Sequence, residues 1–263
     1  MKQIDTYVTG ASGFIGQQLM GLLDPKTTVA IPHQRIPVAH LEHFKRLFYL
    51  AAYGNLRGQD NWEETVNANV LKLAALLLEA RRQSEAKFIF VSSSSVTLKV
   101  QTPYSRCKRA AEELLLSGNG DAYQVLIARP YSITGVGEQR EHLIPTLIRS
   151  CLDGEQMPFY PDAVHDYVDV QDFVEGLILM AMEAKSGIYE FGRGIPVTNG
   201  QVRALVEDAT GKKASAIEHS AGRKYDAQNW YCRSHATQSF GWKPKITLTE
   251  SIHQMVEAHQ QKP

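Results

Sequence analysis

The chain has 263 residues, 43% hydrophobic and 21% charged, so it is long enough to bury a full core. Its formal net charge is zero, which excludes the basic excess typical of proteins that bind nucleic acid. The densest apolar runs, residues 71–78 and 176–182, fall well short of the roughly 20 residues that span a bilayer. We therefore expect neither a nucleic-acid nor a membrane partner.

The cysteines and histidines show no pattern of their own. Cys107, Cys151 and Cys232 are widely spaced and form no Cys-x-x-Cys, which indicates reduced thiols and predicts a cytoplasmic protein. The histidines lack the spacing of metal ligands, so no metal site is expected. The first residues contain no apolar run, and no signal peptide is expected.

Apolar strand-like runs alternate with helical patterns over the first half of the chain, which predicts a parallel sheet covered on both faces. In chain order, the predicted elements are strand 4–9, helix 13–23, strand 28–31, helix 38–44, strand 47–51, helix 62–82, strand 87–91, helix 103–116 and strand 123–128. Thr102 is the predicted cap of helix 103–116. Residues 167–182 are expected to return to the sheet.

A glycine turn follows the first predicted strand, in the run Thr9-Gly10-Ala11-Ser12-Gly13-Phe14-Ile15-Gly16. Gly10 permits a tight turn, Gly13 lets the backbone approach a pyrophosphate, and Gly16 lets helix and strand pack closely. The free amides at the helix N-terminus favour phosphates. We therefore predict a Rossmann-type doubly wound α/β sheet that binds a dinucleotide through Gly10, Ser12, Gly13, Phe14 and Ile15.

The end of the second predicted strand bears on the choice between NAD and NADP. An acidic residue at this position reads the ribose of NAD, whereas a basic residue favours NADP. The run Ile31-Pro32-His33-Gln34-Arg35 contains no acid, which slightly favours NADP, with Arg35 and His33 near the 2′-phosphate. The alternative is that Arg35 is a solvated loop residue and that the cofactor is NAD.

Tyr104 and Lys108 are four residues apart, which places them on one face of helix 103–116. A free tyrosine titrates near ~10, so it is a poor base at neutral pH unless a nearby ammonium favours the phenolate. Such a pair can exchange a hydroxyl proton while a hydride moves. The predicted strand before this helix ends in four serines, residues 92–95, which either terminate the strand or orient a reacting oxygen.

These motifs together resemble the extended short-chain dehydrogenase/reductase family, particularly its nucleotide-sugar epimerases and reductases. The resemblance runs nearly end to end. It is carried by the glycine turn, Leu50-Ala51-Ala52, Asn69-Val70, the serine run, the Tyr/Lys pair, Arg129-Pro130, the run from His165 to Val170, the run from Arg223 to Asp226, and the run from Phe240 to Pro244.

The resemblance implies roles for particular residues. Ser93 falls on the catalytic Ser/Thr, with Ser92 as the fallback, and Lys108 also bonds the nicotinamide ribose. Leu50, Ala51, Ala52 and Asn69 fall on cofactor contacts. Arg223 falls on an arginine that grips the substrate diphosphate, although a surface charge is the alternative. Ser132 and His165 fall on substrate contacts where relatives often carry Asn and Arg.

The chain departs from the family pattern at two further places. The stretch before Leu50 is short, so the usual third strand is expected to be reduced or missing. The 4,6-dehydratases place an Asp-Glu pair after their catalytic Thr, whereas this chain has Ser94-Ser95, which counts against dehydration.

The expected activity is hydride transfer between NAD(P) and C4 of a nucleotide-linked hexose, by a 4-ketoreductase or a 4-epimerase. A reductase of small aldehydes or ketones and a non-catalytic dinucleotide-sensing regulator are the alternatives. Residues 1–130 and 165–183 are the expected dinucleotide-binding domain, and residues 131–164 and 184–263 a smaller substrate-binding lobe. The resemblance also implies a homodimer that pairs through helices 62–82 and 103–116.

Overall fold

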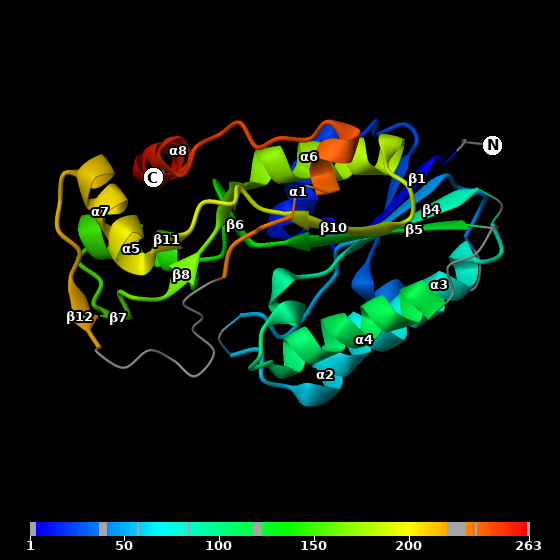
Figure 1. The fold of residues 1–263 in the computed structure, drawn as a ribbon, viewed down its shortest axis with the longest axis horizontal. Helices are drawn as coiled ribbons and strands as arrows, with labels where there is room; N and C mark the ends of the chain where they lie inside the picture. Colours follow the sequence, from blue (N-terminus) through cyan, green and yellow to red (C-terminus); the bar gives the residue numbers. More distant parts are fainter. Residues whose placement is uncertain are drawn as a thin grey trace. The chain divides into compact units, whose positions relative to one another are not determined.

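The computed structural model describes residues 4–36, 41–56, 58–83, 85–117, 123–219, 230–234 and 236–261 (Figure 1). The chain divides into two units. Unit 1 comprises Met1–Pro130, Val174–Glu190 and His235–Trp242, and unit 2 comprises Tyr131–Phe173, Phe191–Ser234 and Lys243–Pro263.

A six-stranded sheet forms the centre of unit 1. Its strands are β1 (Thr6–Thr9), β2 (Thr28–Ile31), β3 (Arg46–Tyr49), β4 (Ala86–Val91), β5 (Tyr123–Pro130) and β10 (Gly187–Phe191), in the order β10-β5-β4-β3-β1-β2. The strand pairs β1–β2, β1–β3, β3–β4 and β4–β5 are all parallel. Val8, Ile89 and Leu126 are fully buried, as expected of parallel strands covered on both faces. The predicted Rossmann-type fold is confirmed.

Helices cover both faces of this sheet. They are α1 (Phe14–Leu22), α2 (Trp62–Val66), the π-helical turn Asn67–Leu71, α3 (Lys72–Ala80), α4 (Pro103–Ser117) and α6 (Val170–Glu183). Figure 1 shows α3 and α4 on one face and α1 and α6 on the other. Thr102 caps α4 as predicted, because its Oγ1 accepts the amide of Ser105 at 3.2 Å. The predicted helix 62–82 is interrupted at its centre by the π-helical turn.

The connection between β2 and β3 confirms one prediction and corrects another. Among the described residues the sheet ends at β2, and none of them adds a third strand on that side. The predicted helix 38–44 is wrong in its described part, because residues 41–44 have no helical structure, while 37–40 lie outside the described residues. The amide of Leu41 donates to Glu79 Oε2 at 3.3 Å instead of to a preceding carbonyl, and Phe44 is fully buried against Tyr7. These tertiary contacts replace local helical bonds.

The expectation for residues 167–182 also needs correction, because they add no strand to the central sheet. β9 (Tyr167–Asp169) pairs with β6 (Ser132–Thr134) in a separate two-stranded sheet, and α6 follows directly. Phe173, Leu177 and Ala181 are buried at a spacing of four residues, so this apolar run has a helical period. The strand that extends the sheet beyond β5 is β10.

Unit 2 has a helical core of its own. It contains α5 (Leu143–Leu152), α7 (Asn199–Thr210) and α8 (Leu248–Gln260), with the strands β6, β7 (Met157–Phe159), β8 (Val164–His165), β9, β11 (Val197–Thr198) and β12 (Ala216–Glu218) in three small sheets. Leu147, Val202 and Ile252 are fully buried in one cluster. Capping boxes at Thr198 and Thr247 begin α7 and α8.

The two units share one boundary with the predicted domains, at residues 130 and 131. Residues 165–173 lie in unit 2, and residues 184–190 and 235–242 lie in unit 1. The roles assigned to the two domains stay predictions. No helix in the described part of the chain is long and apolar enough to cross a membrane.

Candidate active site

The glycine turn between β1 and α1 is built so tightly that side chains would not fit. A Cβ on Gly16 would lie 2.0 Å from the carbonyl oxygen of Gly10, and a Cβ on Gly10 would lie 2.7 Å from the amide nitrogen of Ala51. Gly10 also has a φ of +68°, in the left-handed region that favours glycine. Close packing of the turn against α1 and the end of β3 therefore requires both glycines.

The N-terminus of α1 is open to a ligand. Gly13, its N-cap, is exposed and offers no side chain to the first-turn amides. Ser12 is also exposed, while Phe14 and Ile15 are half-buried. The first-turn amides and the positive end of the helix dipole can thus meet an anion such as a pyrophosphate.

The carboxyl ends of β1, β3 and β4 bring the predicted motifs to one edge of the sheet, because these neighbouring strands are parallel. Thr9 Oγ1 accepts the amides of Leu50 and Ala51, each at 3.2 Å, and so joins the glycine turn to the end of β3. Ala52 is exposed just beyond. In open α/β sheets, ligands bind outside such carboxyl ends.

The residues near the end of β2 have different surroundings. His33 Nε2 lies 3.3 Å from Glu64 Oε1 at the start of the 62–80 helix, so the tertiary structure supplies a carboxylate that the second strand itself lacks. Arg35 is exposed in the short 3-10 turn His33–Arg35. Glu64 was not singled out from the sequence, because 31 residues separate it from His33.

Asn69 is fully buried in the π-helical turn rather than presented on a surface. Its side-chain amide donates to the carbonyls of Tyr53 and Thr65, at 2.7 and 2.8 Å. Tyr49 donates its hydroxyl to the carbonyl of Ala68 in the same turn, at 2.6 Å. These bonds hold the π-helical turn, which packs against α4, the helix that carries Tyr104 and Lys108.

Tyr104 and Lys108 lie on the same face of α4, as their spacing predicts. The Lys108 ammonium donates to the carbonyl of Val91 at 2.8 Å and lies 5.6 Å from the centre of the Tyr104 ring. It also lies 4.7 Å from the centre of the Phe90 ring. Only 1% of Lys108 is exposed. The end of β4 therefore fixes the lysine beside the tyrosine.

Burial changes the protonation of both groups. It lowers the pKa of Lys108 to about 7, against the opposing effect of the Glu112 carboxylate. It raises the pKa of Tyr104 well above its ordinary value. The Tyr104 phenol thus keeps its proton at neutral pH, and this state suits a proton donor.

The serine run separates into distinct environments. Ser93 is half-buried, and its hydroxyl lies 2.8 Å from that of Ser95 while accepting the Ser95 amide at 3.2 Å. Ser92 is buried and donates to Glu112 Oε1 at 2.5 Å. Arg129 binds both oxygens of Glu112, at 2.9 and 2.5 Å. Ser92 therefore belongs to a structural network, which favours Ser93 as the serine available to a substrate.

Glu112 is a residue that the sequence reading missed. Its spacing of four from Lys108 was the available signal, because it places the carboxylate on the same face of α4. Glu112 joins α4 to the ends of β4 and β5, so it is a positioning residue for the helix that carries Tyr104 and Lys108.

Ser132 and His165, two of the predicted substrate contacts, lie in unit 2. Ser132 Oγ lies 3.2 Å from His165 Nδ1. The Trp230 ring packs against His165 and Tyr131, with ring centres 5.3 and 6.1 Å apart, and its indole nitrogen is buried without a hydrogen-bond partner among the described residues. Tyr131 and Trp230 show no regular spacing in the sequence, so only the structure reveals that they pack beside His165. Arg223 lies outside the described residues.

The fold and the carboxyl-edge arrangement define a Rossmann-type protein with a tight glycine turn after its first strand and a half-buried tyrosine beside a buried lysine. The family model described as NAD dependent epimerase/dehydratase family matches residues 37–192. The chain belongs to this family.

Individual relatives are nucleotide-sugar enzymes by name. The chain is 26% identical to a GDP-6-deoxy-D-mannose reductase of Pseudomonas aeruginosa over 94% of each chain. It is 26% identical to a dTDP-glucose 4,6-dehydratase of Streptomyces antibioticus, over 73% of this chain and 63% of that enzyme, so it spans less than two thirds of the dehydratase. The solved structure of MoeE5 in complex with UDP-glucuronic acid and NAD superposes with a TM-score of 0.87 at 26% identity, covering 98% and 99% of the two chains.

Proposed function

We propose that this protein is an NAD(P)-dependent oxidoreductase or epimerase that acts at C4 of a nucleotide-linked hexose. One observation carries the proposal. The glycine turn after β1 and the Lys108 ammonium at the end of β4 lie at the same edge of one parallel sheet, with Tyr104 beside the lysine. This edge can hold a dinucleotide next to a group that exchanges protons.

The residues at the glycine turn fit a dinucleotide. Gly10, Ser12, Gly13, Phe14 and Ile15 would hold its pyrophosphate at the open N-terminus of α1, and Leu50, Ala51 and Ala52 would line its path along the sheet edge. Lys108 would bind the nicotinamide ribose, because one ammonium proton is used by Val91 and two remain. When bound, the nicotinamide supplies or accepts the hydride.

The side chains of the chain itself would handle the proton. Tyr104 gives its phenolic proton to the oxygen at the reacting carbon, or takes that proton back when the reaction runs in reverse. Ser93 donates a hydrogen bond to the same oxygen and orients it. Lys108, when charged, stabilises the phenolate that Tyr104 becomes after it has given up its proton.

The relatives and unit 2 support the proposed substrate class. The reductase and dehydratase relatives carry GDP-linked and dTDP-linked sugars in their names, and MoeE5 binds UDP-glucuronic acid. Ser132, His165 and Arg223 are our proposed contacts to such a substrate. The residues after Ser93 are Ser94 and Ser95 rather than an acidic pair, so we favour ketoreduction or epimerisation over dehydration.

Arg35 carries our slight preference for NADP. It is exposed and can approach a 2′-phosphate, whereas the Glu64 carboxylate beside His33 makes that histidine a poorer phosphate ligand. Direct titration with NADPH and NADH tests the preference. Replacement by Arg35→Ala should weaken NADPH binding and leave NADH binding unchanged.

A panel of UDP-, GDP- and dTDP-hexoses and their 4-keto forms tests the function. Incubation with NADH or NADPH should oxidise the cofactor if the protein is a ketoreductase, as followed by absorbance. Nuclear magnetic resonance should detect inversion at C4 if it is an epimerase. Turnover of small aldehydes alone would favour the small-carbonyl alternative, and dinucleotide binding with no turnover of either class would favour the regulator.

Arg223 separates the nucleotide-sugar enzyme from a small-carbonyl reductase. A bidentate contact to a diphosphate contributes roughly 1.5–3 kcal/mol, so Arg223→Ala should weaken UDP, GDP or dTDP binding about ten- to hundred-fold. Calorimetric titration measures this, with Arg140→Ala as the control because Arg140 is an exposed arginine paired with Glu155 in the same unit. Equal binding by wild type and the Arg223 variant would remove Arg223 from the site.

A homodimer is part of the same proposal. Leu71 and Leu78 are each 59% exposed on the helix that begins with α2, while Leu73 and Leu77 face the core. The outward leucines could cover a partner's helices. Sedimentation at micromolar concentration should give twice the chain mass of 29.4 kDa, and a species at 29.4 kDa would contradict the dimer.

A further inference from the structure

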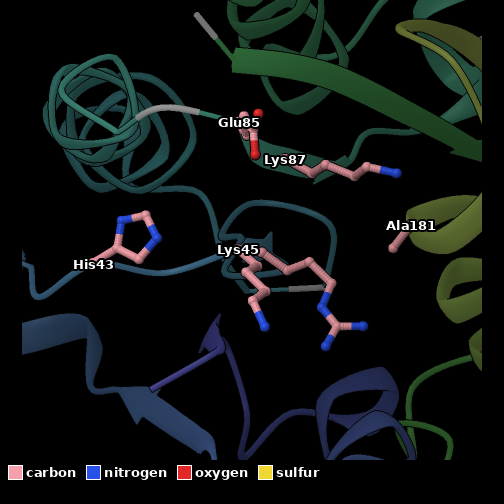
Figure 2. A pocket seen from close by; sticks show the side chains of 6 residues that line it. His43, Lys45, Glu85, Lys87 and Ala181 are labelled. Atoms are coloured by element: carbon pink, nitrogen blue, oxygen red, sulfur yellow. The ribbon is translucent and has the colours of Figure 1, made fainter. Parts of the chain in front are cut away.

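The amino ends of β3 and β4 border a pocket in unit 1, at the opposite end of the strands from the glycine turn. Its volume is about 450 Å³, which falls in the range of small-molecule sites, roughly 300–1,000 Å³. The lining residues are His43, Lys45, Arg46, Glu85, Lys87 and Ala181 (Figure 2). Figure 2 shows His43 and Ala181 on opposite sides of the hollow, with Lys45 and Lys87 between them. Three cations and one carboxylate thus surround this space, although the chain as a whole carries no net charge.

Arg46 and Lys87 are direct neighbours across two strands. They pair in the first rung of the parallel ladder between β3 and β4, so their side chains share one face of the sheet. Like charges directly opposite each other destabilise a sheet. A compensating anion at this rung would remove the repulsion.

The described residues do not provide that anion for Arg46. Its guanidinium makes no hydrogen bond or ion pair with them, and its Nε is buried without a partner. Within the described part of the chain, Lys87 donates only to a neutral acceptor, the carbonyl of Met182, at 3.1 Å. Lys45, by contrast, has its own carboxylate, because its ammonium lies 3.1 Å from Asp5 Oδ1.

The electrostatics of Lys87 agree with this geometry. Burial lowers the pKa of Lys87, the positive charge of Arg46 lowers it further, and the carboxylate of Glu183 acts in the opposite direction. Neither Glu183 nor Glu85 lies within ion-pair distance of Arg46 or Lys87 in the described part of the chain. Two cations that line the pocket therefore lack direct counter-charges among the described residues.

We propose that this pocket binds a small oxyanion, either a phosphate or a carboxylate, through Arg46 and Lys87. The guanidinium fork suits two oxygens of one such group, and the lysine ammonium supplies a point charge beside it. The site is separate from the dinucleotide site, because Arg46 and Tyr49 mark the two ends of β3, roughly 10 Å apart at about 3.3 Å per residue.

The test measures the melting temperature of the whole protein in increasing inorganic phosphate or citrate, with sodium chloride at matched ionic strength. An anion that binds only the folded state raises the melting temperature in a saturable way. We expect such a rise for wild type with phosphate, citrate or both, and the more effective of the two identifies the group. Calorimetry with the effective anion then gives its Kd.

Arg46→Met is the decisive variant. It keeps the apolar stem and removes the charge, so it should bind the anion at least about tenfold more weakly. It should also melt at a higher temperature than wild type without anion, because the repulsion is gone. Lys26→Met removes an exposed charge outside the pocket and should behave as wild type.

Three outcomes would overturn the proposal. One is a wild-type protein whose melting temperature does not rise with either anion beyond the chloride control. Another is a rise of equal size in wild type and Arg46→Met, which would assign the anion to the glycine turn. The third is a loss of binding in Lys26→Met equal to that in Arg46→Met. Binding of NADH or NADPH should be unchanged in both variants, so a failure here leaves the proposed function standing.

Discussion

The two ends of the central sheet both hold buried or half-buried cations, but their surroundings differ. At the carboxyl end, Lys108 donates to Val91, faces two aromatic rings and has the Glu112 carboxylate one helical turn away. At the amino end, Arg46 has no partner among the described residues and faces Lys87 across the ladder. The Lys108 ammonium thus has a hydrogen-bond acceptor and a nearby carboxylate, whereas the Arg46 guanidinium has neither among the described residues.

This difference shows that the partners of a buried cation indicate its role. A cation that the protein fixes through a hydrogen bond, as Val91 fixes Lys108, is held in position to act on a neighbour, as we propose for Lys108 and Tyr104. A cation that is buried without partners has a desolvation cost that an external ligand can offset. The number of hydrogen-bond partners of a buried cation therefore distinguishes a cation held in place by the protein from a cation that can bind an external ligand.

The largest expected effect comes from the carboxyl end. Tyr104→Phe removes the proton-transfer group and should lower turnover by about 10²- to 10⁴-fold with dinucleotide affinity nearly intact. Steady-state kinetics and cofactor titration check this. Tyr189→Phe is the control, since the Tyr189 hydroxyl donates only to the carbonyl of Lys185. Wild-type turnover in the Tyr104 variant would remove the catalytic assignment.

The glycine turn should be almost as sensitive. Gly16→Ala places a methyl group 2.0 Å from the Gly10 carbonyl oxygen, so it should cost at least about 1–3 kcal/mol of unfolding free energy and weaken dinucleotide binding. Gly21→Ala lies in the same helix with open space around it and should stabilise by up to about 1 kcal/mol. Urea unfolding of both variants measures the contrast, and two variants of equal stability would contradict the tight turn.

The ionisation of Lys108 predicts a pH dependence of stability. Its folded pKa is lowered to about 7, so the unfolded chain binds more protons between pH 7 and its ordinary value near 10.5. Wild-type stability should therefore rise with pH across this window, by ~1.4 kcal/mol per pKa unit at most. Lys108→Met should lack this rise, so its unfolding free energy relative to that of wild type should be higher at pH 6.5 than at pH 9.5. Urea unfolding at a series of pH values measures this. If the stability of wild type and of Lys108→Met changed with pH in parallel, Lys108 would keep its charge in the folded state and the prediction would be wrong.

The smallest effect concerns the repulsion at the amino end. Without added anion, a double-mutant cycle of Arg46→Met and Lys87→Met should give a repulsive coupling of about 0.2–1 kcal/mol. The double variant should be less stable than the sum of the two single effects implies, because either change alone removes the repulsion. A favourable coupling would mean that another group bridges the two cations. Saturating phosphate or citrate should reverse the sign in our proposal.

Much of the carboxyl-end site was predictable from sequence because its signals are local. The glycine turn occupies eight consecutive residues, and the Tyr/Lys pair needs only the period of one helix. The order of strands and helices followed from alternating apolar patterns. Hydrogen bonds and sterics act over a few residues in these cases, so spacing alone carries the information.

Other features were decided only by the tertiary structure. Ser92 and Ser93 are adjacent in sequence, yet only the contact with Glu112, 20 residues away, engages Ser92 in a structural network. Glu64 meets His33 across 31 residues, and the predicted helix 38–44 is replaced in its described part by contacts to distant groups. The Arg46–Lys87 rung exists because β3 and β4 pair in the register that places these two residues opposite each other. Sequence periodicity specifies which face a side chain takes, whereas strand register and long-range packing specify which charge it meets.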